Sequence, residues 1–176
     1  MAKSNNGLAD DILEFLVDLA QLLPRPFETP YMHLSRIRNL EYRKYYKSVY
    51  YLKRKGLLQQ SKKGGQVWIQ ATRAAELRVL FHKAAFDQKS KWDGRWRFVI
   101  FDIPESARSQ RALLRSLLRV NNFYKLQASV FVCPYPLNRE AVLYLKETDL
   151  IKYIRILRVD EIDDDSDLRK RFKIKF

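Results

Sequence analysis

A short apolar run that ends in an acid and a proline limits the fold of this chain more than any other feature. Residues 98–101, Phe-Val-Ile-Phe, have the composition of a buried strand, and Asp102-Ile-Pro-Glu follows them directly. Burying a carboxylate is costly and proline cannot donate to a sheet ladder, so we expect the strand to surface at Asp102. The sequence therefore predicts a strand over residues 97–103 that ends at an exposed acid.

The segments after this strand continue in an alternating order. Leucines recur at helical spacing over residues 106–121, and one bent or two short strands are expected over 124–133. A helix over 138–147 and a strand over 151–159 follow. This βαββαβ order is the ferredoxin-like arrangement.

The first half of the chain has a different order, in which helices come first. Apolar spacing, a threonine-proline start at 29–30, a glycine stop at 56 and a Gly-Gly turn at 64–65 mark its elements. The predicted elements are helices over 8–23, 30–39 and 41–55, strands over 57–60 and 67–71, and a helix over 72–83. This is the order of a winged helix-turn-helix domain.

We therefore predict an α+β protein with two domains. A winged helix-turn-helix domain for DNA binding is expected over residues 1–85, a polar linker over 86–91, and a ferredoxin-like dimerisation domain over 92–176. No apolar run approaches the roughly 20 residues that span a membrane. The single Cys133 is expected to be buried, and the absence of a signal-like segment favours a cytoplasmic location.

The distribution of positive charge indicates a polyanionic partner. The net charge is +14, and the segment from Tyr31 to Lys63 contains ten Lys or Arg residues against one acid, Glu41. Such a concentration attracts and steers nucleic acid, and double-stranded DNA is the favoured partner. An anionic membrane is the weaker alternative, because the basic helix has no second apolar face for lipid.

The third predicted helix has the two faces that groove binding requires. Tyr45, Val49 and Leu52 share one face and are expected to point into a core, while basic residues share another, with Tyr50 near them. Lysines at the tip of the hairpin suit a wing, and a solvated basic face is the plainer alternative. The predicted DNA-binding residues are Arg36, Arg38, Arg43, Lys44, Lys47, Tyr51, Arg54, Lys62 and Lys63.

The Asp102-Ile-Pro-Glu segment followed by Gln127-Ala-Ser-Val-Phe resembles the small CRISPR adaptation nuclease family. With Trp92-Asp-Gly-Arg-Trp and a basic helical domain before it, the chain is still more similar to the PaaX family of repressors. The resemblance implies a winged helix that binds operators as a dimer. PaaX relatives commonly carry a further C-terminal domain and respond to an acyl-coenzyme A; this sequence ends at Phe176, so that ligand is not carried over.

The resemblance also implies a candidate metal site. In the CRISPR nucleases the acid that ends the first strand meets its counterpart across a two-fold axis and can hold a divalent ion, and Asp102 matches that position. Two carboxylates suit Mg²⁺, and a metal-activated water could attack a phosphodiester. Glu105 and Ser129 are possible neighbours. The alternative is that Asp102 only caps the turn into the next helix.

Three further groups have both a functional and a structural interpretation. Trp92 and Trp96 are expected to anchor the packing between the two halves rather than to stack on bases. An arginine stripe on the helix over 106–121 is either a second nucleic-acid surface or a solvated face: Arg108, Arg111, Arg115 and Arg119. The alternating residues 171–176 predict a final strand, whose apolar row pairs with a second copy in a homodimer: Phe172, Ile174 and Phe176.

The sequence thus predicts a sequence-specific DNA-binding transcriptional regulator, a repressor acting as a homodimer. A Mg²⁺-dependent endonuclease that uses Asp102 and a DNA-bridging subunit without sequence preference are the alternatives. The operator, the regulated genes, any small-molecule effector and any association with a CRISPR integrase cannot be read from these residues.

Overall fold

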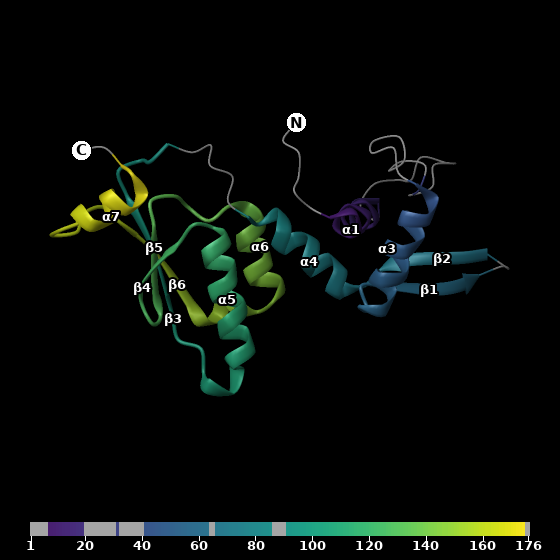
Figure 1. Cartoon of the computed structure of the whole chain (residues 1–176). Helices are drawn as coiled ribbons and strands as arrows, with labels where there is room; N and C mark the ends of the chain where they lie inside the picture. Colours follow the sequence, from purple (N-terminus) through teal and green to yellow (C-terminus); the bar gives the residue numbers. More distant parts are fainter. Residues whose placement is uncertain (1–6, 20–30, 32–40, 64–65, 86–90, 175–176) are drawn as a thin grey trace. The chain divides into compact units, whose positions relative to one another are not determined.

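The structure, a computed structural model, describes residues 7–19, 31, 41–63, 66–85 and 91–174. The chain forms two compact units, residues 1–79 and residues 80–176, and each is described separately. The α-helices and strands of both are labelled in Figure 1. None of the helices in the described ranges is long and apolar enough to cross a membrane.

The first unit consists of helices around a small core, with a two-stranded hairpin. Its elements are α1 (Leu8–Leu19), α3 (Tyr42–Arg54), β1 (Leu58–Lys63), β2 (Gln66–Ala71) and the start of α4 (Arg73–Lys83). Apolar residues from all five elements share one core, which includes Ile12 of α1 and Leu52 of α3, both fully buried. The predicted helices and hairpin are confirmed here, while the helix expected over 30–39 lies outside the described residues, apart from Tyr31.

The end of α3 and the base of the hairpin are fixed by local hydrogen bonds. Gly56 has a positive φ of 68°, and the Leu57 N–H donates to the Leu52 carbonyl at 3.0 Å, which closes the helix with a Schellman-type turn. The Thr72 hydroxyl donates to the Gly56 carbonyl at 2.8 Å and accepts from the Ala75 N–H at 3.4 Å. One side chain therefore caps α4 and ties it to the end of α3.

The second unit is a four-stranded antiparallel sheet with helices. Its strands are β3 (Trp96–Phe101), β4 (Tyr124–Gln127), β5 (Val130–Cys133) and β6 (Ile154–Val159), in the spatial order β4-β5-β3-β6. The other elements are η1 (Glu105–Ala107), α5 (Arg108–Val120), α6 (Arg139–Glu147), η2 (Leu150–Tyr153) and α7 (Ser166–Phe172). The order β3-α5-β4-β5-α6-β6 is the ferredoxin-like order predicted from the sequence.

One face of this sheet carries the main core of the unit. Val99, Phe101 and Phe131 are buried on it, because alternate residues of a strand share a face and Val99 pairs with Phe131. Helix α5 lies against this face: the Arg115 guanidinium is 5.8 Å from the centre of the Phe101 ring, and the Cys133 thiol donates to the Asn121 carbonyl just after α5. Figure 1 shows α5 and α6 beside the sheet.

The other face of the sheet is covered at one end by α7. Leu168 packs in a cluster with Trp96 and Val132, and Phe172 and Ile174 join that cluster. The final strand predicted over residues 171–176 is therefore wrong, since residues 166–172 are helical and Lys173 ends the helix with a φ of 55°. Leu168 and Phe172 are four residues apart and form the buried side of this helix. The alternation of basic and apolar residues in 171–176 led to the prediction of a strand instead.

This arrangement also removes the reason for a dimer interface at the end of the chain. Phe172 and Ile174 pack against the sheet of their own chain, so a second copy is not needed to cover these two side chains. Phe176 lies outside the described residues.

The two tryptophans before β3 pack inside the second unit. Trp96 is 1% exposed, its ring centre lies 5.9 Å from that of Phe172, and its indole N–H donates to Asp165 at 2.9 Å. The Trp92 ring lies 5.3 Å from Trp96, with the Arg169 guanidinium 4.8 Å above it. Within the second unit they do anchor packing, since they hold α7 against its own sheet.

Candidate nucleic-acid interface

Helix α3 has one face in the core and an opposite face that is basic. Tyr45, Val49 and Leu52 are buried, as predicted. The exposed cations recur at intervals of four and seven residues and so form one stripe, since about 3.6 residues make a turn. On the helical wheel this stripe is centred opposite the buried residues, and it consists of Arg43, Lys47 and Arg54.

The cations of this stripe are not neutralised within the part of the chain that the structure describes. No carboxylate there pairs with Arg43, Lys47 or Arg54, whereas Lys44 forms an ion pair with Glu41 at 3.1 Å. Unpaired cations on a rigid helix keep their full charge for an external anion. The arrangement suits phosphates and the acceptor edges of bases.

Exposed tyrosines are a feature of α3 that the sequence prediction undervalued. Four of them are exposed on this one helix, with exposed fractions of 57%, 49%, 64% and 45% for Tyr42, Tyr46, Tyr50 and Tyr51. Exposed aromatic rings grouped with cations mark a surface that is covered by a partner. The signal was present in the sequence as two Tyr-Tyr pairs in a basic helix, yet only Tyr51 was assigned to DNA binding.

Two of these rings are held in place by their neighbours. The ring centres of Tyr42 and Tyr46 are 4.3 Å apart, and Tyr31 lies 5.1 Å from Tyr42. A hydrogen bond with Tyr46 is the main cause that raises the pKa of Tyr42, so its hydroxyl is neutral at physiological pH. Neutral hydroxyls next to cations can donate hydrogen bonds to phosphate oxygens.

The other residues predicted for this surface are described only in part. Lys62 and Lys63 belong to β1, where their backbones pair with Val67 and Gln66 next to the turn, but their side chains lie outside the described atoms. Arg36 and Arg38 fall outside the described residues. Their roles stay predictions.

The arginine stripe of α5 divides into two pairs with different surroundings. Arg111 donates to the Glu105 carboxylate at 2.8 Å and to the Ile103 carbonyl at 2.6 Å. Arg115 donates to the Ala128 carbonyl at 2.9 Å and stacks over Phe101. These two guanidiniums fix the loops at the end of β3 and between β4 and β5, while Arg108 and Arg119 are exposed.

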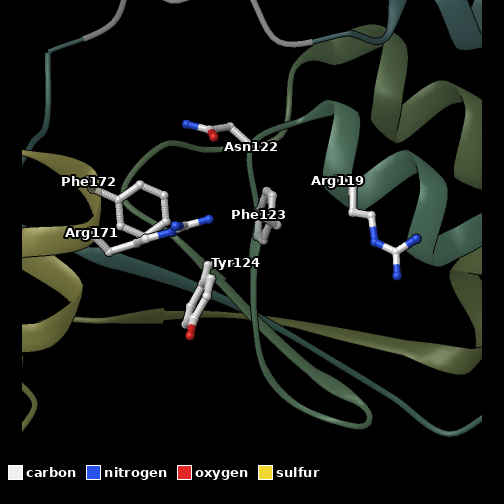
Figure 2. Close-up of a pocket in the computed structure, with 6 residues that line it drawn as sticks. All are labelled: Arg119, Asn122, Phe123, Tyr124, Arg171 and Phe172. Atoms are coloured by element: carbon white, nitrogen blue, oxygen red, sulfur yellow. The ribbon is translucent and has the colours of Figure 1, made fainter.

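Arg119 borders a pocket of about 250 Å³ at the far end of α5. Figure 2 shows Arg119 on one side and Arg171 of α7 on the other, with Phe123 between them in this view. The Arg171 guanidinium lies 5.0 Å from the centre of the Tyr124 ring. The pocket lining contains no acid, so its charge is positive: Arg119, Asn122, Phe123, Tyr124, Arg171 and Phe172.

The predicted metal position has a single exposed carboxylate in the described part of the protein. Asp102 follows β3 directly, as expected, and its N–H donates to the Tyr153 carbonyl at 3.0 Å. The carboxylate of Glu105, a predicted neighbour, is paired with Arg111. Within the described ranges no three His, Cys, Asp or Glu side chains are grouped to hold a metal ion. A Mg²⁺ site at Asp102 would need ligands from a second molecule or from the nucleic acid.

Cys133 is buried, as predicted. Desolvation raises the pKa of its thiol to about 11. The thiol is therefore neutral and a poor nucleophile at physiological pH, which argues against a redox or catalytic role.

The comparisons with known proteins concern the second unit. The family model of the PaaX protein central Cas2-like domain matches residues 89–170. This domain belongs to the PaaX family. The match covers the whole sheet with α5 and α6 and confirms the resemblance found in the Trp92 and Asp102 segments. A search of curated proteins gave no match. A PaaX-type domain indicates a transcriptional regulator.

Proposed function

We propose that the protein is a sequence-specific DNA-binding transcriptional regulator, a repressor, whose first unit is a winged helix-turn-helix domain. The observation that carries the proposal is the outward face of α3, where Arg43, Lys47 and Arg54 have no acidic partner among the described residues. The PaaX-type domain in residues 89–170 supports the same class of function. In this proposal α3 enters the major groove and the β1–β2 hairpin is the wing that contacts the backbone.

The contacts between α3 and the hairpin support this assignment. Thr72 at the base of the hairpin is hydrogen-bonded to Gly56 at the end of α3, so helix and wing keep a fixed relation. A groove-reading helix and a backbone-contacting wing must act on the same duplex, which requires such a relation. Lys62 and Lys63 at the end of β1 supply the charge for the backbone contact.

We further propose that the protein acts as a homodimer through the uncovered part of its sheet. Ile100 of the inner strand β3 and Leu157 of the neighbouring edge strand β6 are 38% and 43% exposed. They share the face on which α7 covers only the Trp96 end, since Leu157 pairs with Phe98, two residues before Ile100. An exposed apolar patch of this kind suits a self-complementary two-fold contact.

The dimer is tested by sedimentation at micromolar concentration with two matched variants. Leu157→Asp is expected to give monomers, while Leu143→Asp, an equally exposed leucine on α6, is expected to leave the dimer intact. Both side chains are exposed, so neither charge disturbs the core. A monomeric wild-type protein, or equal behaviour of the two variants, would contradict this interface.

The DNA-binding function is tested by selection of bound sites from random duplexes, followed by affinity measurements on the selected duplex in EDTA. The wild type is expected to select a sequence and to bind it without divalent ions. Lys47→Ala should lower the affinity and reduce the salt slope by about 1 if Lys47 contacts a phosphate. Lys146→Ala, an exposed lysine of α6, is the charge-matched control.

The same preparation separates the two alternatives. A DNA-bridging protein would bind all duplexes alike and select no sequence. A nuclease would cleave DNA or RNA in Mg²⁺ or Mn²⁺, and Asp102→Asn would abolish the cleavage, because the amide keeps the shape but loses the charge that holds the ion. We expect no cleavage, and Asp102→Asn should change the affinity by less than a few-fold.

A further inference from the structure

Tyr50 of α3 is an aromatic side chain without a partner among the described residues of its unit. Its exposed fraction of 64% is the largest among the large apolar residues that the structure describes. The rings of Tyr42 and Tyr46 contact each other, and Tyr51 lies 5.8 Å from the Lys55 ammonium, but no described ring, cation or polar group contacts Tyr50. A large ring held in water on a rigid helix contributes nothing to this fold.

The position of Tyr50 places it within the basic stripe. It lies three residues after Lys47 and four residues before Arg54, so the three side chains follow one another along one side of the helix. Tyr50 follows the buried Val49 by one position, which turns it about 100° away from that core residue. When this side of the helix faces a groove, the cations have phosphates within reach, and Tyr50, about 40° around the helix from the middle of the stripe, faces the bases beside those phosphates.

The chemistry of tyrosine differs from that of its neighbours in a way that can be measured. A neutral side chain releases no counterions, so it adds nothing to the salt dependence of binding. Its ring is apolar, and the apolar group that bases present in the major groove is the 5-methyl group of thymine. The side chain is therefore suited to sequence discrimination and unsuited to general attraction.

From these observations we infer that Tyr50 is a specificity-determining residue whose ring packs against a thymine methyl group in the major groove. This inference rests on the proposed DNA-binding function. The cations of the stripe position the helix on the backbone, and Tyr50 distinguishes a T·A pair from the others at one position of the half-site.

The experiment uses the duplex selected by the wild-type full-length protein, with each thymine replaced in turn by deoxyuridine, which removes only the methyl group. At one thymine of each half-site the wild type is expected to lose about fourfold in affinity, the effect of one buried methyl group. Tyr50→Ala should bind the thymine duplex about tenfold more weakly and should not distinguish thymine from uracil at that position. Its salt slope should equal that of the wild type.

Tyr50→Phe keeps the ring and is the matched variant. It should retain the uracil sensitivity, which separates the ring from the hydroxyl. The inference is overturned if no uracil substitution weakens wild-type binding, or if Tyr50→Ala keeps the full sensitivity. A wild-type protein that selects no sequence at all would instead overturn the proposed function, so the two failures are distinguishable.

Discussion

Helices α3 and α5 are both 13 residues long and both carry a row of basic side chains, yet the two rows have different surroundings. On α3 the stripe of Arg43, Lys47 and Arg54 lies opposite the core, and no acid in the described structure pairs with these three cations. On α5 two of four arginines turn back to the protein, where Arg111 binds Glu105 and Ile103 and Arg115 binds Ala128. Similar rows of charge thus have no described acidic partner on α3, whereas on α5 two of the arginines hold the internal structure.

The difference follows from what the neighbouring loops offer. The loops next to β3 and β5 present the carbonyls of Ile103 and Ala128 to α5. An arginine can donate to such carbonyls because its guanidinium has several N–H groups in a fixed plane. Around α3 the described surroundings are helices and a hairpin, and no carbonyl among the described residues accepts a hydrogen bond from Arg43, Lys47 or Arg54. The charges of a basic helix are available to an external partner only where they are not already bound to nearby carbonyls or carboxylates of the same protein.

The sharpest test of the comparison removes two arginines from each helix. Arg43→Ala with Arg54→Ala should lower the affinity for the selected duplex by at least about 100-fold, since each hydrogen bond to a charged phosphate contributes about 1.5–3 kcal/mol. The melting temperature should stay unchanged, because both side chains are exposed. Affinity and thermal unfolding are measured on the same preparations. Unchanged affinity would remove α3 from the interface.

The matched double variant, Arg111→Ala with Arg115→Ala, has the same change in charge but the opposite expected outcome. The free energy of unfolding should fall by about 2 kcal/mol, because three hydrogen bonds to a carboxylate and two carbonyls are lost. DNA affinity should change by less than a few-fold. Denaturant unfolding measures the first effect. If affinity drops while stability is kept, the α5 stripe is a second nucleic-acid surface.

A smaller effect concerns acid sensitivity in the second unit, where charges are paired internally. A hydrogen bond from Arg97 lowers the pKa of Asp93 below its usual value of 3.8. A lowered carboxyl pKa contributes stability that is present above about pH 4 and is lost as the pH falls through the folded-state pKa. Asp93→Asn should therefore be less stable than the wild type at pH 7, and the two should converge toward pH 2.

The control for this effect is Asp102→Asn, which removes an exposed carboxylate with no cationic partner among the described residues. Its free energy of unfolding at pH 7 should stay close to that of the wild type, because the side chain is exposed and forms no described ion pair. A difference for Asp93→Asn that does not change with pH would contradict the assigned role of the Arg97 pair.

The elements that the sequence predicts well are those whose signals are local. The glycine at 56, the threonine at 72 and the apolar spacing of α3 are each interpreted within a few residues, and the structure bears out the helices and hairpin they imply. The outward face of α3 follows from the same spacing, because the buried residues determine which side chains point away.

The features that the sequence does not determine depend on residues far apart in the chain. The alternation in residues 171–176 is compatible with a strand, but the indole N–H of Trp96 and the cluster around Leu168 favour a helix at 166–172. The internal use of Arg111 and Arg115 depends on carbonyls at 103 and 128 that meet α5 only in the folded sheet. The exposure of the four tyrosines depends on which residues cover each ring in the folded protein, and the sequence does not show this.

The hydroxyl of Thr72, bonded to both Gly56 and Ala75, has a consequence for the heat of the proposed association. Since helix and hairpin are already joined at this point, little ordering between them is left to occur on DNA. Calorimetry should then find a heat-capacity change that matches the apolar area covered at the contact, without the larger component that accompanies folding on binding. Thr72→Val keeps the shape but removes the hydroxyl that joins the hairpin to the end of α3. More ordering would then occur on DNA, so the favourable binding enthalpy and the unfavourable binding entropy should both be larger in magnitude.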